Sequence, residues 1–368
     1  MERANVVIIG GGIVGCAIAA ELAARTSDVF VLEQMPRVGM ATSTRNSGVI
    51  HSGIYYAPGS LKARHCVEGN RLTYEFCAAH DVPHKRSGKL VVATTPEEER
   101  ELEQLLARGR QNGVEALEII SADELRKREP HVAGRAALWV PSTGKVESEG
   151  LVKAFAALAQ SRGAYIATDA RVQSVEPRPD SIRAVATNVG EIEARVFINA
   201  AGLFADEVAA LFGNRSYKIY PCRGEYWEVT GPKARWVNGL VYPAPDPTGL
   251  SLGVHLTKTL WGSLLLGPNA RYVTDKNDYE RDLEARESFC AHAQKLLPQL
   301  QPEDLRPGYS GLRAKLAPPG HHGIVDFVIE RDPQFPHVIH LVGIESPGLT
   351  AAPSLARHVA GLVSETLF

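Results

Sequence analysis

Three glycines near the N-terminus and one acidic residue after them have the spacing of a dinucleotide-binding site. Gly10, Gly12 and Gly15 follow four apolar residues in a G-x-G-x-x-G pattern. The first glycine permits a tight turn, the second lets a pyrophosphate approach the backbone, and the third lets the next helix pack closely. Glu33 ends a second apolar run, where its carboxylate can accept hydrogen bonds from a ribose. An ordinary glycine-rich turn would leave Glu33 unexplained.

The far end of the chain offers a second set of cofactor-binding groups. Residues 343–350 read Gly-Ile-Glu-Ser-Pro-Gly-Leu-Thr and precede a predicted helix. Their backbone N–H groups and the helix dipole would stabilise the negative charge that reduction leaves near the pyrimidine edge of a flavin. The chain has one G-x-G-x-x-G pattern, so a separate NADH domain is not expected. Together these features favour FAD over NAD, and an ordinary turn is the alternative for 343–350.

The elements that must position these groups alternate between helix and strand. The patterns predict strands over 6–9, 29–33, 90–93, 165–168, 171–176 and 195–199. They predict helices over 16–25, 60–79, 95–108 and 150–162, and the third begins with a Thr95/Glu98 capping box. From 217 to 316, short β-rich segments broken by Gly and Pro predict an antiparallel sheet with one helix near 279–297.

Length and composition limit the class of protein. With 368 residues, the chain is long enough for two domains. We expect a discontinuous cofactor domain over 1–80, 146–214 and 318–368, and a substrate domain over 81–145 and 215–317. The net charge of −2 argues against a nucleic-acid partner.

Cysteine use and apolar runs indicate where the protein resides. The five cysteines are Cys16, Cys66, Cys77, Cys222 and Cys290. Their number is odd and they contain no C-x-x-C pair, so neither a metal site nor a disulfide framework is expected. The N-terminal apolar run superficially resembles a signal peptide, but it is the strand and turn of the nucleotide site. No other uncharged run approaches the ~20 residues of a membrane span. We therefore expect a cytoplasmic protein.

Four segments carry a family resemblance: RNSGVIHSGIYY (45–56), PCRGEYW (221–227), YSGLRAKL (309–316) and GIESPGLT (343–350). With the fingerprint they resemble the D-amino-acid-oxidase-type FAD-dependent oxidoreductases over nearly the whole chain. The chain is most similar to the L-2-hydroxyglutarate dehydrogenase/oxidase branch, for which NSGVIHSGIYY followed by GSLKARHCVEG is specific. The resemblance implies an α/β fold (α+β overall), with a Rossmann-like FAD domain of the glutathione-reductase type and a mostly antiparallel β substrate domain. It also implies oxidation of L-2-hydroxyglutarate to 2-oxoglutarate. No cysteine or histidine lies in a setting that singles out a covalent link to the flavin, so we expect non-covalent FAD.

The resemblance and the glycine patterns together give a set of expected FAD contacts. Arg45 is a departure, because dehydrogenases of this branch have a histidine before the asparagine. The expected FAD-binding residues are Gly10, Gly12, Ile13, Val14, Gly15, Glu33, Gln34, Thr44, Arg45, Asn46, Ser47, Gly48, Val172, Ala200, Gly202, Gly311, Gly343, Ser346, Pro347, Gly348, Leu349 and Thr350.

Flavin oxidation of a 2-hydroxy acid needs a held carboxylate, a base for the hydroxyl proton and an α-hydrogen aimed at the flavin. A base with a pKa near 6.5 suits the proton transfer. We expect His51 as this base, with His255 in reserve; a plain hydrogen-bonding role is the alternative for His51. Arg313 matches the arginine that grips the substrate carboxylate in the wider superfamily, and its planar fork suits a carboxylate.

A second carboxylate would need further donors. The expected substrate-binding residues are Tyr55, Tyr56, Lys62, Arg223, Tyr242, His255 and Lys315. Arg223 has a structural alternative, which is an ion pair with Glu225.

Two other functions stay open. An amine or amino-acid oxidase of the glycine- or sarcosine-oxidase kind would need no strong base, and a non-catalytic flavoprotein would not react with either class of substrate. The electron acceptor is either oxygen or a quinone, and quinone use would imply peripheral contact with the membrane.

Overall fold

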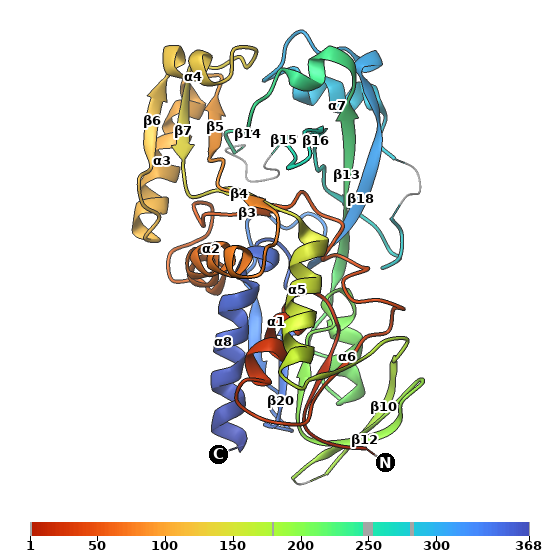
Figure 1. The fold of residues 1–368 in the computed structure, drawn as a ribbon. Helices are drawn as coiled ribbons and strands as arrows, with labels where there is room; N and C mark the ends of the chain where they lie inside the picture. The colour runs from red at the N-terminus through yellow and green to blue at the C-terminus, as the bar shows by residue number, and fades with distance from the viewer. Residues whose placement is uncertain (1, 179, 246–252, 280–282, 368) are drawn as a thin grey trace.

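Two large sheets organise residues 2–178, 180–245, 253–279 and 283–367, which the computed structural model describes (Figure 1). The lower sheet has a parallel centre made of β1 (Glu2–Ile9), β2 (Val29–Leu32), β9 (Tyr165–Ala167), β12 (Gly190–Asn199) and β20 (Val338–Val342). Three antiparallel strands extend it: β10 (Val172–Pro177), β11 (Ile182–Ala186) and β19 (Val328–Arg331). The order is β10-β11-β12-β1-β2-β9, with β20 also beside β12 and β19 beside β20.

Both faces of the central strand β1 are covered. Val6 and Ile8 pack in the apolar cluster that contains α1 (Ile13–Leu22), α5 (Ser148–Ser161) and α8 (Gly348–Leu367). Val7 and Ile9 pack on the opposite face, in a cluster with residues of α6 (Ala205–Leu211). A strand buried on both faces requires the continuous apolar run seen in the sequence. The predicted Rossmann-like arrangement is confirmed.

The upper sheet is mostly antiparallel, as predicted. Its order is β17-β13-β16-β15-β14-β5-β7-β6, with β18 also beside β13. Its strands are β5 (Lys89–Ala93), β6 (Glu118–Ser121), β7 (Ala136–Val140), β13 (Tyr220–Val229), β14 (Leu240–Pro243), β15 (Leu256–Lys258), β16 (Leu264–Leu266), β17 (Arg271–Tyr272) and β18 (Leu305–Lys315). The β5/β14 pair is parallel.

Smaller elements complete the upper body and the junction. Helices α3 (Pro96–Gln111), α4 (Ala122–Arg128) and α7 (Arg286–Ala293) pack on the upper sheet, while α2 (Leu61–Ala79) packs on α8. A small sheet joins β3 (Val49–Ile50), β8 (Gly144–Val146) and β4 (His84–Lys85). Strands β13 and β18 run down from the upper body toward the lower one (Figure 1), and they pair Cys222 with Arg313. This pair therefore carries residues of the upper sheet to the cofactor domain.

Four helices differ from their predicted bounds by more than one residue, and the third ends at Gln111 rather than 108. The first begins at Ile13 rather than 16, because Gly12 is its N-cap and Gly15 lies inside the helix. The fourth begins at Ser148, since the Glu147 carboxylate accepts from the Glu149 and Gly150 N–H groups. Among the described residues, the helix expected over 279–297 is confined to α7, whereas residues 280–282 lie outside that part of the chain. Before α7, the Glu284 N–H donates to Glu225 at 2.9 Å, which holds that segment outside the helix.

The remaining expectations concern capping, domains and the membrane. Thr95 caps α3 by accepting from the Glu98 N–H, but the Glu98 carboxylate accepts from Thr94 rather than completing the predicted box. The domain boundaries stay a prediction. Among the helices that the structure describes, none has both the length and the apolar character needed to cross a bilayer.

Candidate active site

A cavity of about 1490 Å³ lies where the two sheets meet, and residues of both line it. Its walls include Gly10 and Gly12, the loop 39–47, Gly311–Arg313 of β18 and the turn 344–349. Small-molecule pockets are typically ~300–1,000 Å³. This cavity is therefore large enough for a dinucleotide together with a small substrate.

The glycine fingerprint forms one end of the cavity. Gly10 has a φ of +113°, and a Cβ there would run into the Ala200 carbonyl, so the turn requires glycine. A Cβ on Gly15 would overlap the carbonyl oxygen of Gly10, which explains why the third residue of the helix must be glycine. The N-cap residue Gly12 has no side chain that could accept from the first N–H groups of α1. The Ile13 N–H instead donates to Ser43 Oγ at 2.9 Å. The start of α1 thus presents N–H groups and a hydroxyl to an anion.

Glu33 is held in place by the backbone. Its Oε2 accepts from the Gly11 N–H at 2.7 Å, and its Oε1 accepts from the Met35 N–H at 2.8 Å. Burial raises the pKa of this carboxyl, and the N–H groups oppose that shift by stabilising the carboxylate. Each carboxylate oxygen can accept a further hydrogen bond. Glu33 and Gln34 line the cavity, where ribose hydroxyls can reach them.

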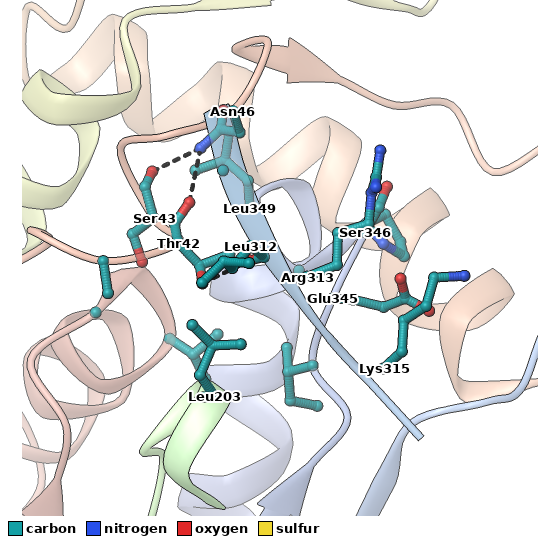
Figure 2. Close-up of a pocket in the computed structure, with 18 of the residues that line it drawn as sticks. Thr42, Ser43, Asn46, Leu203, Leu312, Arg313, Lys315, Glu345, Ser346 and Leu349 are labelled. Carbon is teal, nitrogen blue, oxygen red and sulfur yellow. Dashed lines mark hydrogen bonds between the residues drawn. The ribbon is translucent and has the colours of Figure 1, made fainter. Parts of the chain in front are cut away.

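Asn46 shapes the loop between the fingerprint and β18. Its amide donates to the carbonyls of Ser43 (2.7 Å) and Thr42 (3.3 Å), as Figure 2 shows. Its carbonyl oxygen accepts from the Gly48 N–H and from Ser148 Oγ. Asn46 therefore lines the cavity and also fixes the backbone that presents Ser43 and Ser47 to it.

The start of α8 closes the cavity on another side. Ser346, Pro347, Gly348 and Leu349 line it, which brings the positive end of a long helix to the site. Val172, Ala200 and Gly202 also reach the cavity, as do Arg45 and Gly311. The glycine turn, the held carboxylate and two helix N-termini form a site that fits FAD.

His51 lies between the cofactor turn and the substrate sheet. Its N–H donates to Thr350 Oγ1 and its carbonyl accepts from Asn70 Nδ2, both at 2.9 Å. Nε2 lies 3.4 Å from Ser346 Oγ, and the buried Nδ1 has no hydrogen-bond partner among the described residues. Burial, assisted by the charge of Lys89, lowers the pKa of His51 to about 3. The ring is therefore neutral at physiological pH, although far less basic than the expected value near 6.5.

Arg313 brings a guanidinium to the same cavity from β18. Its Nη2 donates to the Asn269 carbonyl at 3.0 Å, and Nη1 lies 3.8 Å from Cys222 Sγ. In the part of the chain that the structure describes, no carboxylate forms an ion pair with Arg313. Because a guanidinium has five N–H donors, several are available to a carboxylate in the cavity.

The other expected substrate residues divide into two groups. Tyr55, Tyr56, Lys62, Tyr242, His255 and Lys315 line the cavity. Within this group, Lys62 is ion-paired with Glu345 at 3.0 Å, and the Tyr242 and His255 rings stack 3.6 Å apart.

Arg223 does not reach the cavity, which contradicts its expected role. The side chain is 1% exposed and forms ion pairs with Glu225 and Asp278, each at 2.7 Å. Strand β13 points it away from the site, so the structural alternative of an Arg223–Glu225 pair is correct.

Five expected cofactor residues lie behind the cavity wall: Gly15, Thr44, Gly48, Gly343 and Thr350. They support the wall rather than line it. Thr44 Oγ1 donates to the Gly39 carbonyl, and Thr350 Oγ1 holds the His51 backbone.

The sequence patterns missed Ser43, Tyr226 and Lys89. Ser43 lies in the polar loop that was expected beside the cofactor, but nothing distinguishes it there from its Ser and Thr neighbours. Tyr226 lines the cavity from a β13 position that reads as ordinary strand. Lys89 is the first residue of an apolar strand, and no local pattern indicates that its charge is buried.

Comparison with known proteins agrees with this geometry. Residues 5–362 match the DAO family model, described as FAD dependent oxidoreductase. The chain is 34% identical to L-2-hydroxyglutarate dehydrogenase of Escherichia coli K12, covering 98% of this chain and 93% of that protein. It is also 34% identical to the mitochondrial L-2-hydroxyglutarate dehydrogenase of Arabidopsis thaliana, over 98% and 83% of the two chains.

Solved structures support the same assignment. The fold matches dithionite-reduced L-alpha-glycerophosphate oxidase from Mycoplasma pneumoniae with FAD bound, with a TM-score of 0.90, 28% identity and coverage of 99% and 95%. Glycine oxidase from Geobacillus kaustophilus, at 23% identity and a TM-score of 0.82 over 99% and 95%, shares the fold. The chain belongs to the DAO family of FAD-dependent oxidoreductases.

Proposed function

We propose that this enzyme oxidises L-2-hydroxyglutarate to 2-oxoglutarate. The full-length relatives named for this activity support the substrate. The observation that carries the proposal is the placement of Arg313 and His51 in one cavity with the FAD cradle. Arg313 supplies a cation for the 1-carboxylate, and His51 supplies a neutral imidazole for the 2-hydroxyl.

FAD, when bound, supplies the two-electron acceptor that takes the α-hydrogen as hydride. Arg313 orients the substrate through a bidentate pair with its 1-carboxylate. The cavity walls then fix the direction of the α-hydrogen, because a carboxylate held at two points cannot rotate freely.

His51 receives the hydroxyl proton at Nε2, on the side of Ser346. With a pKa of about 3, the ring is much too weak a base to ionise an alcohol beforehand, so proton removal must accompany hydride loss. A bound dianion places negative charge near the ring and raises its pKa, which brings His51 closer to a useful value.

We infer that the flavin is non-covalent and that the reduced enzyme passes its electrons to oxygen or to a quinone. The described cysteines are buried free thiols, which supports a reducing compartment such as the cytoplasm. Stopped-flow mixing of the reduced enzyme with oxygenated buffer or with a soluble quinone measures the rate at which each acceptor reoxidises the flavin, and so distinguishes the two. Quinone preference would call for a membrane-binding assay with vesicles.

The decisive test is anaerobic titration of the purified holoenzyme, followed by the visible absorbance of its flavin. L-2-hydroxyglutarate should bleach the flavin, while the D-isomer, glycine and sarcosine should not. Glycerol 3-phosphate belongs in the same series, because the glycerophosphate oxidase is 28% identical and shares the fold closely. Bleaching by an amine alone would favour the amino-acid-oxidase alternative, and bleaching by none of these would refute the proposal.

A further inference from the structure

Lys89 is a fully buried cation behind the wall of the cavity. It begins β5, where it pairs with Val140 of β7. Its ammonium lies 4.5 Å from the centre of the Tyr55 ring and 4.8 Å from that of Tyr242, and Nζ is 3.5 Å from the Tyr55 hydroxyl. No carboxylate of the described residues pairs with it. Tyr55 and Tyr242 both line the cavity, so Lys89 is separated from the cavity by their side chains.

A buried ammonium without an anion is an unfavourable arrangement. Burial lowers the pKa of Lys89 from 10.5 to about 7, which measures how poorly the site holds the charge. The two aromatic rings compensate in part through cation–π attraction. An anion close to Tyr55 would recover the rest of the lost stabilisation.

Two other buried cations near the site already have carboxylate partners. Lys62 pairs with Glu345, and Arg223 pairs with Glu225 and Asp278. Neither of these charges is available to a ligand without breaking its pair. Lys315 lines the cavity without an ion pair among the described residues, but it is only partly buried and water can solvate its charge.

We propose that Lys89 is the positioning residue that makes the enzyme select a dicarboxylate, by supplying the counter-charge for the distal carboxylate through the Tyr55 hydroxyl. Nζ donates to the Tyr55 oxygen, and the Tyr55 O–H then donates to the carboxylate in the cavity. This inference rests on the proposed function, and it names the residue that recognises the second carboxylate. Arg313 would hold the first.

The test compares two substrates that differ only at the far end. L-2-hydroxyglutarate carries a distal carboxylate where L-2-hydroxypentanoate carries a methyl group. In Lys89→Met, kcat/KM for the dicarboxylate should fall roughly 10- to 100-fold, the range for a lost hydrogen bond to a charged group. The kcat/KM for the monocarboxylate should stay within about twofold of that of the unmodified enzyme. The ratio of the dicarboxylate kcat/KM to the monocarboxylate kcat/KM therefore falls sharply. A merely structural role for Lys89 would lower both values together.

Two further variants serve as controls. Lys85→Met removes an exposed lysine from the neighbouring strand β4 and should leave the ratio unchanged. Lys315→Met removes a competing cation that lines the cavity. If the ratio collapses in Lys315→Met and not in Lys89→Met, the proposal is overturned.

A pH series on the unmodified enzyme provides a test that needs no variant. The ratio should decline as pH rises past about 7, because kcat/KM reports groups of the free enzyme and Lys89 loses its proton there. The groups that face Lys89 are Tyr55 and Tyr242, the Cys66 thiol of α2 and His51. Burial raises the pKa of both tyrosines and of Cys66, and that of His51 is about 3, so none of them titrates between about pH 6 and 9. His255, stacked on Tyr242, is excluded if the pH dependence vanishes in Lys89→Met.

Binding without turnover separates this inference from the proposed function. Glutarate and pentanoate are unreactive counterparts of the two substrates, and their binding to the oxidised holoenzyme can be followed by the flavin spectrum. If L-2-hydroxyglutarate does not bleach the flavin but glutarate binds more tightly than pentanoate only when Lys89 is present, the proposed function fails and the inference stands. If bleaching occurs and Lys89→Met keeps the selectivity, the inference fails alone.

Discussion

Replacing Lys89 with methionine should make the folded enzyme more stable at acidic and neutral pH. The pKa of Lys89 is about 7 in the folded protein and 10.5 in the unfolded chain. Below pH 7 the lysine is charged in both states, so the whole cost of burying the ammonium falls on the folded one. Between pH 7 and 10.5 the folded protein binds fewer protons than the unfolded chain, so this cost shrinks as pH rises. Methionine has a similar length and carries no charge.

The size of the effect follows from the two pKa values. Their difference, at about 1.36 kcal/mol per pH unit, corresponds to about 5 kcal/mol as an upper bound. The variant also loses cation–π attraction to two rings, worth ~1–2 kcal/mol for each ring when desolvated. We therefore expect Lys89→Met to gain roughly 1–3 kcal/mol in free energy of unfolding near pH 6. By about pH 10.5 most of that gain should be gone, because the lysine is then half deprotonated in the unfolded chain too and only ~0.4 kcal/mol of the burial cost remains.

Urea unfolding at both pH values measures this difference. Both proteins must carry the same excess of FAD, because a ligand that binds only the folded state adds its own stabilisation. Lys85→Met, which removes an exposed charge, controls for the change in net charge. A variant that is less stable than the unmodified enzyme near pH 6, or a gain that does not shrink at high pH, would show that the ammonium is not strained. Lys89 would then need no carboxylate in the cavity to balance its charge.

Three further substitutions test the rest of the site. Arg313→Met should lower kcat/KM about 10²-fold or more through loss of a charge-assisted pair, while the flavin content measured by absorbance stays that of the unmodified enzyme. His51→Asn should slow anaerobic flavin reduction by ~10²–10⁴-fold. In the unmodified enzyme, kcat/KM should show no acid limb near pH 6.5, because it reports the free enzyme, in which His51 is neutral at every pH well above about 3. Glu33→Gln should weaken FAD binding about tenfold in a fluorescence titration, because the amide replaces one acceptor oxygen with a donor. An unchanged FAD affinity would show that Glu33 does not bind the ribose.

Features that depend on neighbours in sequence could be predicted. The fingerprint glycines are determined by local geometry, since Gly10 needs a positive φ and Gly15 must approach Gly10 closely. The Thr95 cap is equally local, because one side chain satisfies an N–H three residues away. Asn46 was expected at the cofactor, and its hydrogen bonds to Ser43 and Thr42 lie within its own loop. The family resemblance added residues whose neighbours are distant, such as Arg313.

Features that depend on distant partners could not be predicted. Among the described residues, the helix expected over 279–297 begins only at Arg286, and the Glu284 N–H before it donates to the carboxylate of Glu225, a residue of β13 that is distant in sequence. The pKa of His51 fell far below 6.5 because the fold buries the ring and places Lys89 near it. Neither Glu225 nor Lys89 lies near its partner in sequence.

The buried cations show why a charged residue in a shared motif is weak evidence for substrate binding. Lys62 and Arg223 both lie in segments that resemble the family, and both were expected to contact substrate. The fold supplies a carboxylate to each, so their charges are already balanced before any ligand arrives. Lys89 carries no such signal in the sequence, but the fold places its ammonium between two aromatic rings, and no carboxylate of the described residues pairs with it. A charge is available to a ligand only where folding has not already provided its partner, and this condition singles out Lys89 among the three.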